Sequence, residues 1–147
     1  MDKQYPTARL RMNCDVTRLN VIPTYGAIKF RKKAILVKNM PYSIWIEAEQ
    51  WAEGEWNIYD DNTDAIVTFE EGSRWVASFF TYKNILYLAK KNQQTGECLQ
   101  GKYFWGSDMV LVDECSRKRI EEVVEHLIIK GDFEVIFDRC VEDNMEE

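Results

Sequence analysis

The segment 74–82 constrains the fold most, because both of its faces are apolar when it is read as a β-strand. Trp75, Ala77 and Phe79 alternate onto one face, and Val76 and Phe80 alternate onto the other. Successive side chains of a strand point to opposite faces of the sheet, so a strand of this kind is covered on both sides. The sequence therefore predicts a domain built around this strand.

The next apolar run, 85–90, follows after only two residues, Lys83 and Asn84. Two residues between apolar runs are typical of a tight β-hairpin, and asparagine tolerates the positive φ that such turns need. We therefore expect a hairpin of strands 74–82 and 85–90. A polar loop over 92–101 is expected to follow it.

The preceding third of the chain also has strand character. Residues 26–38 are expected to form one or two strands, interrupted by a basic tripeptide at 31–33. Residues 42–51 alternate with a period of two, which predicts a strand whose Tyr/Ile face is half-buried. A further strand is expected at 55–59, closed by a turn over the polar residues 60–64.

The C-terminal third contains the clearest helix. Five apolar residues within 116–130 recur at helical spacing, and Gly131 is well placed to end the helix. These five are Ile120, Val123, Val124, Leu127 and Ile128. A short strand is expected before the helix at 109–112, and a final strand after it at 132–138.

Together these segments predict one α+β domain over residues 1–147. Its core is expected to be a mostly antiparallel sheet of about six or seven strands, with the helix 116–130 packed on it. A chain of 147 residues is long enough to bury a core, and 46% hydrophobic residues exclude disorder from lack of apolar surface. The acidic end, 142–147, is expected to fray.

Composition also limits the compartment. No run of about 18 apolar residues exists, so no membrane span and no membrane partner are expected. The first residues lack the apolar stretch of a secretory signal. Four cysteines without Cys-x-x-Cys spacing, in a chain with a sufficient core, favour reduced thiols over disulfides. A cytoplasmic location is the interpretation that fits these features.

Charge is distributed unevenly along the chain. Residues 1–38 carry nine basic and two acidic side chains, whereas residues 39–147 carry ten basic and 23 acidic ones. The stretch 47–73 holds nine acids and no basic residue, with tryptophans among them. Such a surface is either a solvated face or a docking site for a basic partner, in which tryptophans anchor a charged rim. The candidate partner-binding residues are Glu47, Glu49, Trp51, Glu53, Glu55, Trp56, Asp60, Asp61 and Asp64.

We find no residue pattern that predicts catalysis or a cofactor. His126 is the only histidine, and its position relative to the apolar stripe of the helix predicts that it is exposed. Asp60, Asn62, Asp64 and Glu71 match the ligand spacing of an EF-hand calcium loop. However, Ala65 stands where that loop needs glycine, and the flanking segments read as strands. We therefore expect a turn rather than a metal site, and a protein that is not an enzyme.

Nucleic acid is the alternative partner. The basic segment 29–38, with Tyr25 and Phe30 nearby, has the composition of a surface that tracks phosphates and stacks bases. The strongly acidic remainder of the chain argues against it, because carboxylates repel phosphate. If the segment does not bind nucleic acid, it is expected to be an exposed sheet edge whose basic side chains hinder pairing with another strand.

The order of segments 75–91, 109–114, the helix and the last strand resembles the C-terminal half of immunity proteins from bacterial contact-dependent growth inhibition and related polymorphic toxin systems. The similarity covers roughly residues 74–140 and is one of pattern. It implies a cytoplasmic protein that binds a cognate toxin domain, often a nuclease, and blocks its active site or substrate path. No binding residues of that family can be carried over to particular positions of this sequence.

Overall fold

The computed structural model describes residues 40–141 of the 147-residue chain. The elements follow in the order β1 (Tyr42–Ile46), the 3-10 helix η2 (Glu47–Gln50), β2 (Asn62–Phe69), β3 (Arg74–Thr81), α2 (Tyr82–Thr95), α3 (Glu97–Gly101), β4 (Met109–Val112), α4 (Arg117–Lys130), α5 (Phe133–Ile136) and β5 (Asp138–Cys140). The strands expected at 26–38, the alternative nucleic-acid segment 29–38 and the tail 142–147 lie outside the described residues.

The fold is α+β, with a mostly antiparallel sheet, as predicted. β1, β2 and β3 form an antiparallel meander, and β3 is central. Along its open edge β3 pairs with β4 in parallel through Ser78–Thr81, and with β5 antiparallel through Arg74–Val76. The described part of the chain thus holds five strands, where six or seven are expected for the whole sequence.

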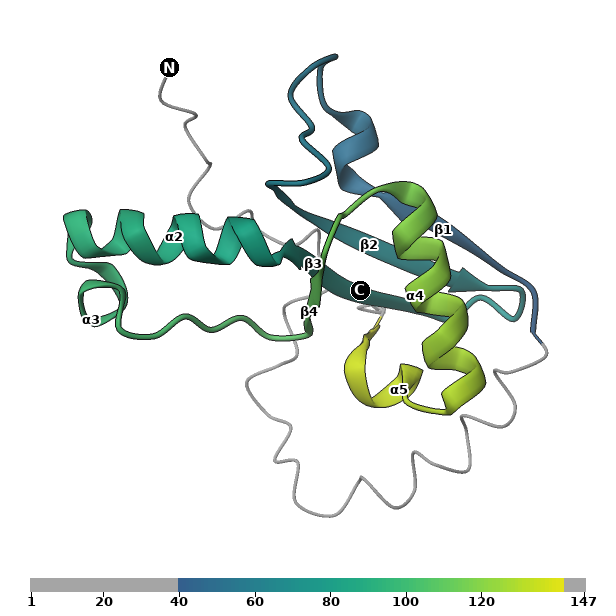
Figure 1. Ribbon diagram of the computed structural model, residues 1–147. Coiled ribbons are helices and arrows are strands. Elements are labelled where there is room, and N and C mark those ends of the chain that lie inside the picture. The colour runs from purple at the N-terminus through teal and green to yellow at the C-terminus, as the bar shows by residue number, and fades with distance from the viewer. Residues whose placement is uncertain (1–39, 142–147) are drawn as a thin grey trace, which may run out of the picture.

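Strand β3 is apolar on both faces, which confirms the interpretation of residues 74–82. Trp75 and Phe79 lie in the main core, which α4 and α5 cover (Figure 1). Val76 is buried on the opposite face beside Ile66, in a smaller cluster that includes Trp45. The alternation of apolar side chains with a period of two therefore places this strand inside the domain.

Helix α4 begins and ends as the sequence predicts. The Ser116 hydroxyl accepts a hydrogen bond from the backbone N–H of Arg119 at 3.2 Å, and Gly131 ends the helix with φ of 86°. The buried residues of the helix are Ile120, Val124, Leu127 and Ile128. His126 is exposed, as expected, and so is Ile129.

The expected hairpin at 74–90 is wrong, because the chain turns into helix α2 directly after β3. The Thr81 hydroxyl accepts from the backbone N–H of Asn84 at 3.1 Å, which caps the helix. The Asn84 side chain is buried and accepts a hydrogen bond from Asn62 Nδ2 at 3.0 Å. The helix continues to Thr95 and ends at Gly96, so residues 92–101 do not form a single polar loop.

Two boundaries in the first described segment also differ from expectation. The strand predicted over 42–51 ends at Ile46, and η2 follows it. The strand predicted at 55–59 is a loop, and residues 62–64, which the sequence places in a turn, open strand β2. The sequence signal fails here because acidic and amide side chains, which usually mark turns, satisfy the backbone of a long loop instead.

The final strand predicted at 132–138 is a short helix, α5, followed by β5. The Asp132 carbonyl accepts from the N–H groups of Val135 and Ile136, both at 3.1 Å. This helical turn stacks the rings of Phe133 and Phe137 at 4.4 Å between centroids. A strand would hold the two residues about 13 Å apart. Phe133 also meets the rings of Phe69 and Trp75 edge to face, so the contacts among these rings outweigh the strand pattern.

Candidate protein-binding surface

The loop between η2 and β2, residues 51–61, holds six of the nine predicted binding residues; we call it the acidic loop. It contains two turns, closed by hydrogen bonds from Glu55 N–H to Ala52 O and from Asp60 N–H to Asn57 O, each at 3.1 Å. Gly54 lies in the first turn with φ of 83°, a conformation that few other residues adopt without strain. Figure 1 shows the loop extending beyond one end of the sheet.

The acidic loop is attached to the segment that precedes α4. Cys115 donates its backbone N–H to Ile58 O at 2.7 Å, and its sulfur accepts from Trp56 Nε1 at 3.5 Å. Trp51 and Trp56 are partly buried and pack against the main core. Both tryptophans therefore hold the loop in place, which differs from the anchoring role expected for them at a partner interface.

Asp61 and Asp60 also face inward. Asp61 is only 5% exposed, and its carboxylate accepts from the backbone N–H groups of Asn57 at 3.2 Å and Asn62 at 3.1 Å. Asp60 accepts from Asn84 Nδ2 at 3.5 Å. These carboxylates fix the end of the loop against β2 and α2, so they are parts of the scaffold.

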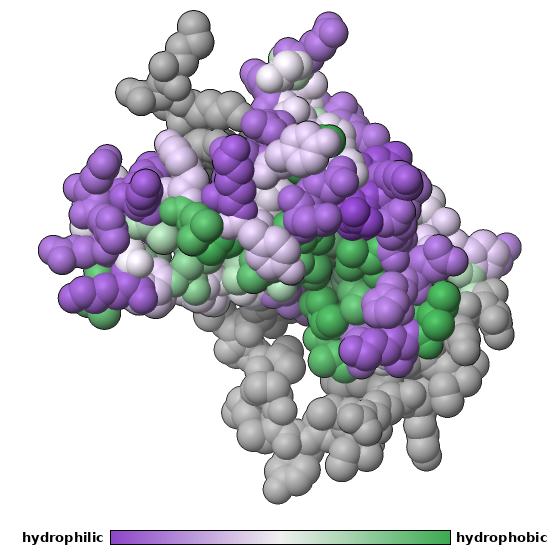
Figure 2. All heavy atoms as spheres, viewed as in Figure 1, coloured by the Kyte–Doolittle hydropathy of each residue, from purple (hydrophilic) through white to green (hydrophobic). Residues whose placement is uncertain are grey.

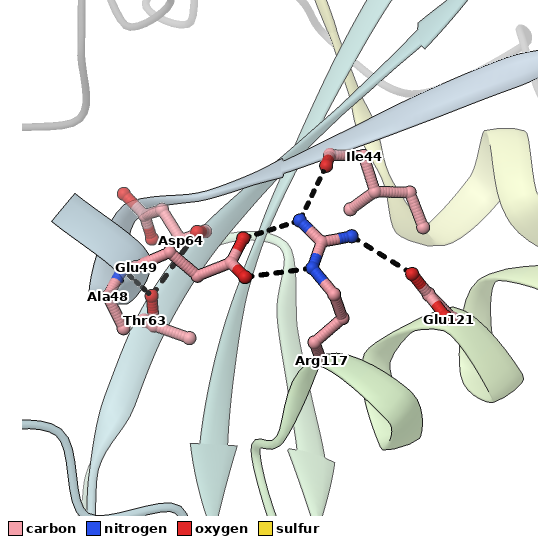
Figure 3. A network of polar contacts seen from close by, with 7 residues as sticks. All are labelled: Ile44, Ala48, Glu49, Thr63, Asp64, Arg117 and Glu121. Atoms are coloured by element: carbon pink, nitrogen blue, oxygen red, sulfur yellow. Dashed lines mark hydrogen bonds and ion pairs between the residues drawn. The ribbon is translucent and has the colours of Figure 1, made fainter.

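Glu49 belongs to a polar network that joins three elements (Figure 3). Arg117 on α4 binds both carboxylate oxygens of Glu49 and donates to Ile44 O at 3.0 Å and to Glu121 at 2.9 Å. The hydrogen bond from Arg117 holds the pKa of Glu49 below its usual value, because it favours the charged carboxylate. Glu49 is therefore committed to an internal ion pair.

The remaining predicted residues divide into two groups. Glu47 is partly covered in η2, and Asp64 lies on the sheet face opposite α4, where the Ser78 hydroxyl donates to it. Glu53 and Glu55 are exposed on the acidic loop. Only these last two present carboxylates from the part of the loop that points away from the core.

Tyr59 is an exposed aromatic residue of the acidic loop that the sequence analysis misses. Its side chain is 61% exposed and lies within the second turn, whereas Glu53 and Glu55 belong to the first. The sequence pattern places it in a strand at 55–59, where an aromatic residue signals burial. The flanking Asp60-Asp61-Asn62 run is the available signal that Tyr59 lies in a loop.

Charge separates the described residues into two regions. Residues 40–81 and 106–141, which we call the body, carry 18 acidic and six basic side chains, a net charge of −12. Residues 82–105, which we call the arm, carry four lysines and one glutamate, a net charge of +3. The acidic loop therefore lies on the strongly negative region.

Two kinds of site can be checked directly in residues 40–141: a calcium loop and a pair of Cys115 with His126. No cluster of three or more metal-ligating side chains occurs in this range, and residues 62–69 are a strand, not a calcium loop. Burial raises the pKa of the Cys115 thiol to about 11, so it stays protonated and unreactive at neutral pH. His126 follows Ser116 by ten residues on the same helix, roughly 15 Å along its axis, too far for a Cys115–His126 pair.

The cysteines and the helices give two further findings. Cys98 and Cys115 have free thiols, which agrees with the expectation, whereas Cys140 is disulfide-bonded, which does not. None of the helices within 40–141 has the length and apolar character needed to cross a membrane.

Comparison with known proteins assigns the chain to no family. No family model matches it, and neither a curated protein nor a solved structure does.

Proposed function

We propose that this protein acts by binding another protein, and that the acidic loop docks on a basic surface of that partner. The observation that carries the proposal is the outward placement of Glu53, Glu55 and Tyr59 on a loop whose own backbone is held by internal hydrogen bonds. A loop that is already ordered loses little conformational freedom on binding.

The field of the body supports the same partner chemistry. A net charge of −12 attracts a basic domain over several ångströms and accelerates encounter, while it disfavours acidic partners. Tyr59 would supply the aromatic contact that anchors many interfaces, and Glu53 and Glu55 would lie at the rim of that interface.

The partner class that we propose is a toxin domain, in particular a nuclease, because an enzyme that binds phosphate has a basic cleft that carboxylates can occupy. The protein would then be an immunity-type inhibitor that blocks the active site or substrate path. The strand at 109–112 and the helix α4 are the parts of the resemblance that occur in the structure. Its hairpin at 75–91 does not occur, so the proposal rests on the acidic loop.

The direct test is binding to the C-terminal domain encoded immediately upstream of this protein. The variant Glu53→Lys/Glu55→Lys should lower the association rate at least about tenfold in low salt, since steering of this kind contributes roughly 10- to 1000-fold. The wild-type rate should itself fall as salt is raised. Surface plasmon resonance at two salt concentrations measures both effects.

The matched control is Glu70→Lys/Glu71→Lys, which makes the same change in net charge at the turn between β2 and β3, the opposite end of β2. If both double variants bind equally well, the acidic loop is not the interface. If no complex forms with the upstream domain, the immunity proposal fails. A shift of single-stranded oligonucleotides by the same protein would then favour the nucleic-acid alternative.

A further inference from the structure

The arm, residues 82–105, projects from the end of β3 away from the sheet, with α3 at its far end (Figure 1). Leu86, Leu99 and Trp105 are 70%, 69% and 71% exposed. Figure 2 shows hydrophobic surface over α2 between hydrophilic side chains. Three largely exposed side chains of this kind on one segment indicate an interaction site.

Helix α2 has an outer stripe that nothing in the described part of the chain covers. Tyr82, Leu86 and Lys90 are spaced four residues apart and are all exposed, so they form one face of the helix. On the other side, Ile85 and Leu88 are half-buried. The helix therefore packs one face inward and presents a tyrosine and a leucine on the other, where a partner can cover them.

The end of the arm holds an unfavourable backbone that presents Leu99. Cys98, Leu99 and Gln100 have φ of 50°, 50° and 58°, a left-handed run that L-residues disfavour. Gly101 closes this turn against α2, where a Cβ would lie 2.3 Å from Ala89 O. Unfavourable backbone of this kind is found at ligand and partner sites, because contacts made there compensate for it.

Charge selects the occupant. The arm carries +3, so the N-terminal segment 1–38, which carries +7, is disfavoured as a cover for it. An acidic and partly apolar surface is favoured. The body of a second copy of this chain has that chemistry, with a net charge of −12.

The outer face of α4 is the part of the body that fits best. Glu125 and Ile129 lie one turn apart on it and are exposed, which combines a carboxylate with an apolar side chain. Tyr42 lies beside this face. Burial is the main cause that raises the pKa of its hydroxyl, and the nearby carboxylates of Glu125 and Glu121 raise it further. The face therefore complements the stripe of Tyr82, Leu86 and Lys90.

We propose that the protein forms a twofold dimer in which the arm of each copy docks on the outer face of α4 of the other. A reciprocal arrangement uses both surfaces on both copies, which doubles the buried area, and it closes instead of growing into a filament. The acidic loop does not take part, so the dimer can form whether or not the proposed toxin binding is correct.

Analytical ultracentrifugation of the full chain, from roughly 1 to 200 µM, tests the dimer over the usual range of weak to moderate dissociation constants. The wild type should dimerise reversibly, and Leu86→Glu should raise the dissociation constant at least about tenfold, since it places a carboxylate where a leucine is buried. Val135→Glu, which makes the same kind of change at a residue that is 66% exposed and lies on α5, outside both surfaces, should leave the constant unchanged.

Charge reversal identifies the docking partner of the arm. Lys90→Glu and Glu125→Lys should each weaken the homodimer, because each places like charges together. An equimolar mixture of the two variants should dimerise again, since both halves of the mixed dimer are then complementary. Circular dichroism confirms that each variant is folded.

The proposal is overturned if the wild type stays monomeric at every concentration, or if Leu86→Glu dimerises like the wild type. A mixture of the two charge variants that remains monomeric would overturn α4 as the target. Binding of a single-stranded oligonucleotide that depends on Lys90 in a monomeric protein would assign the arm to nucleic acid instead.

Discussion

Phe133→Ala should be strongly destabilising, and Val135→Ala should have almost no effect. Phe133 is 1% exposed, and its ring contacts Phe69, Trp75 and Phe137 at centroid distances of 5.4, 5.7 and 4.4 Å. Replacing such a ring by alanine costs about 3–5 kcal/mol, from lost burial and the cavity left behind. Val135 is 66% exposed in the same short helix, so its truncation should change stability by less than about 0.5 kcal/mol.

Urea unfolding followed by tryptophan fluorescence measures both values. A loss of about 4 kcal/mol moves the midpoint by roughly 2 M, if the slope is about 2 kcal/mol per molar urea. The pair of variants also separates a helix from the strand that the sequence predicts at 132–138. In a strand, 133, 135 and 137 share one face, so Val135→Ala would cost more than about 1 kcal/mol. That result, or a loss below about 1 kcal/mol for Phe133→Ala, would refute the reasoning.

Arg117→Met should lower stability by about 1 kcal/mol at pH 7, a value reduced for solvent screening because the pair with Glu49 is about a third exposed. The pKa of Glu49 is lowered in the folded state, so this stabilisation is present above the unfolded pKa of 4.5 and is lost as pH falls through the folded pKa. Unfolding of the wild type and the variant from pH 7 to 3 should therefore show the difference in their free energies of unfolding narrowing below about pH 4.5. Cys115 should resist a thiol reagent at pH 8 in the native protein and react after unfolding, because its pKa is about 11. Rapid labelling of Cys115 in the native protein, located by peptide mapping, would contradict this. Gly101→Ala should loosen the end of the arm, since the φ of Gly101 is 76° and a Cβ there would collide with the backbone of α2. Amide hydrogen exchange in 86–101 should be faster than in the wild type, and unchanged exchange would argue against the close approach of Gly101 to α2.

The partner-binding surface could be predicted only in part. The sequence shows that 47–71 is acidic, but it cannot show which carboxylates form hydrogen bonds or ion pairs within the domain. Asp61 caps a loop, and Glu49 pairs with Arg117, which is 68 residues away in the chain. Both roles depend on neighbours that only the folded chain brings together.

Elements whose signals are local could be predicted from the sequence. Strand β3 follows from a period of two, and α4 follows from its apolar spacing, with Ser116 before it and Gly131 after it. Contacts between distant parts of the chain settle the other elements. The run 82–95 carries apolar residues that suit a strand or a helix. The Thr81 cap is a local signal for the helix, and the hydrogen bond from Asn62 on β2 to the buried side chain of Asn84 fixes it. At 133–137 the contacts of Phe133 with Phe69 and Trp75, together with its stack on Phe137, decide against an extended strand, because these ring contacts outweigh intrinsic strand preference.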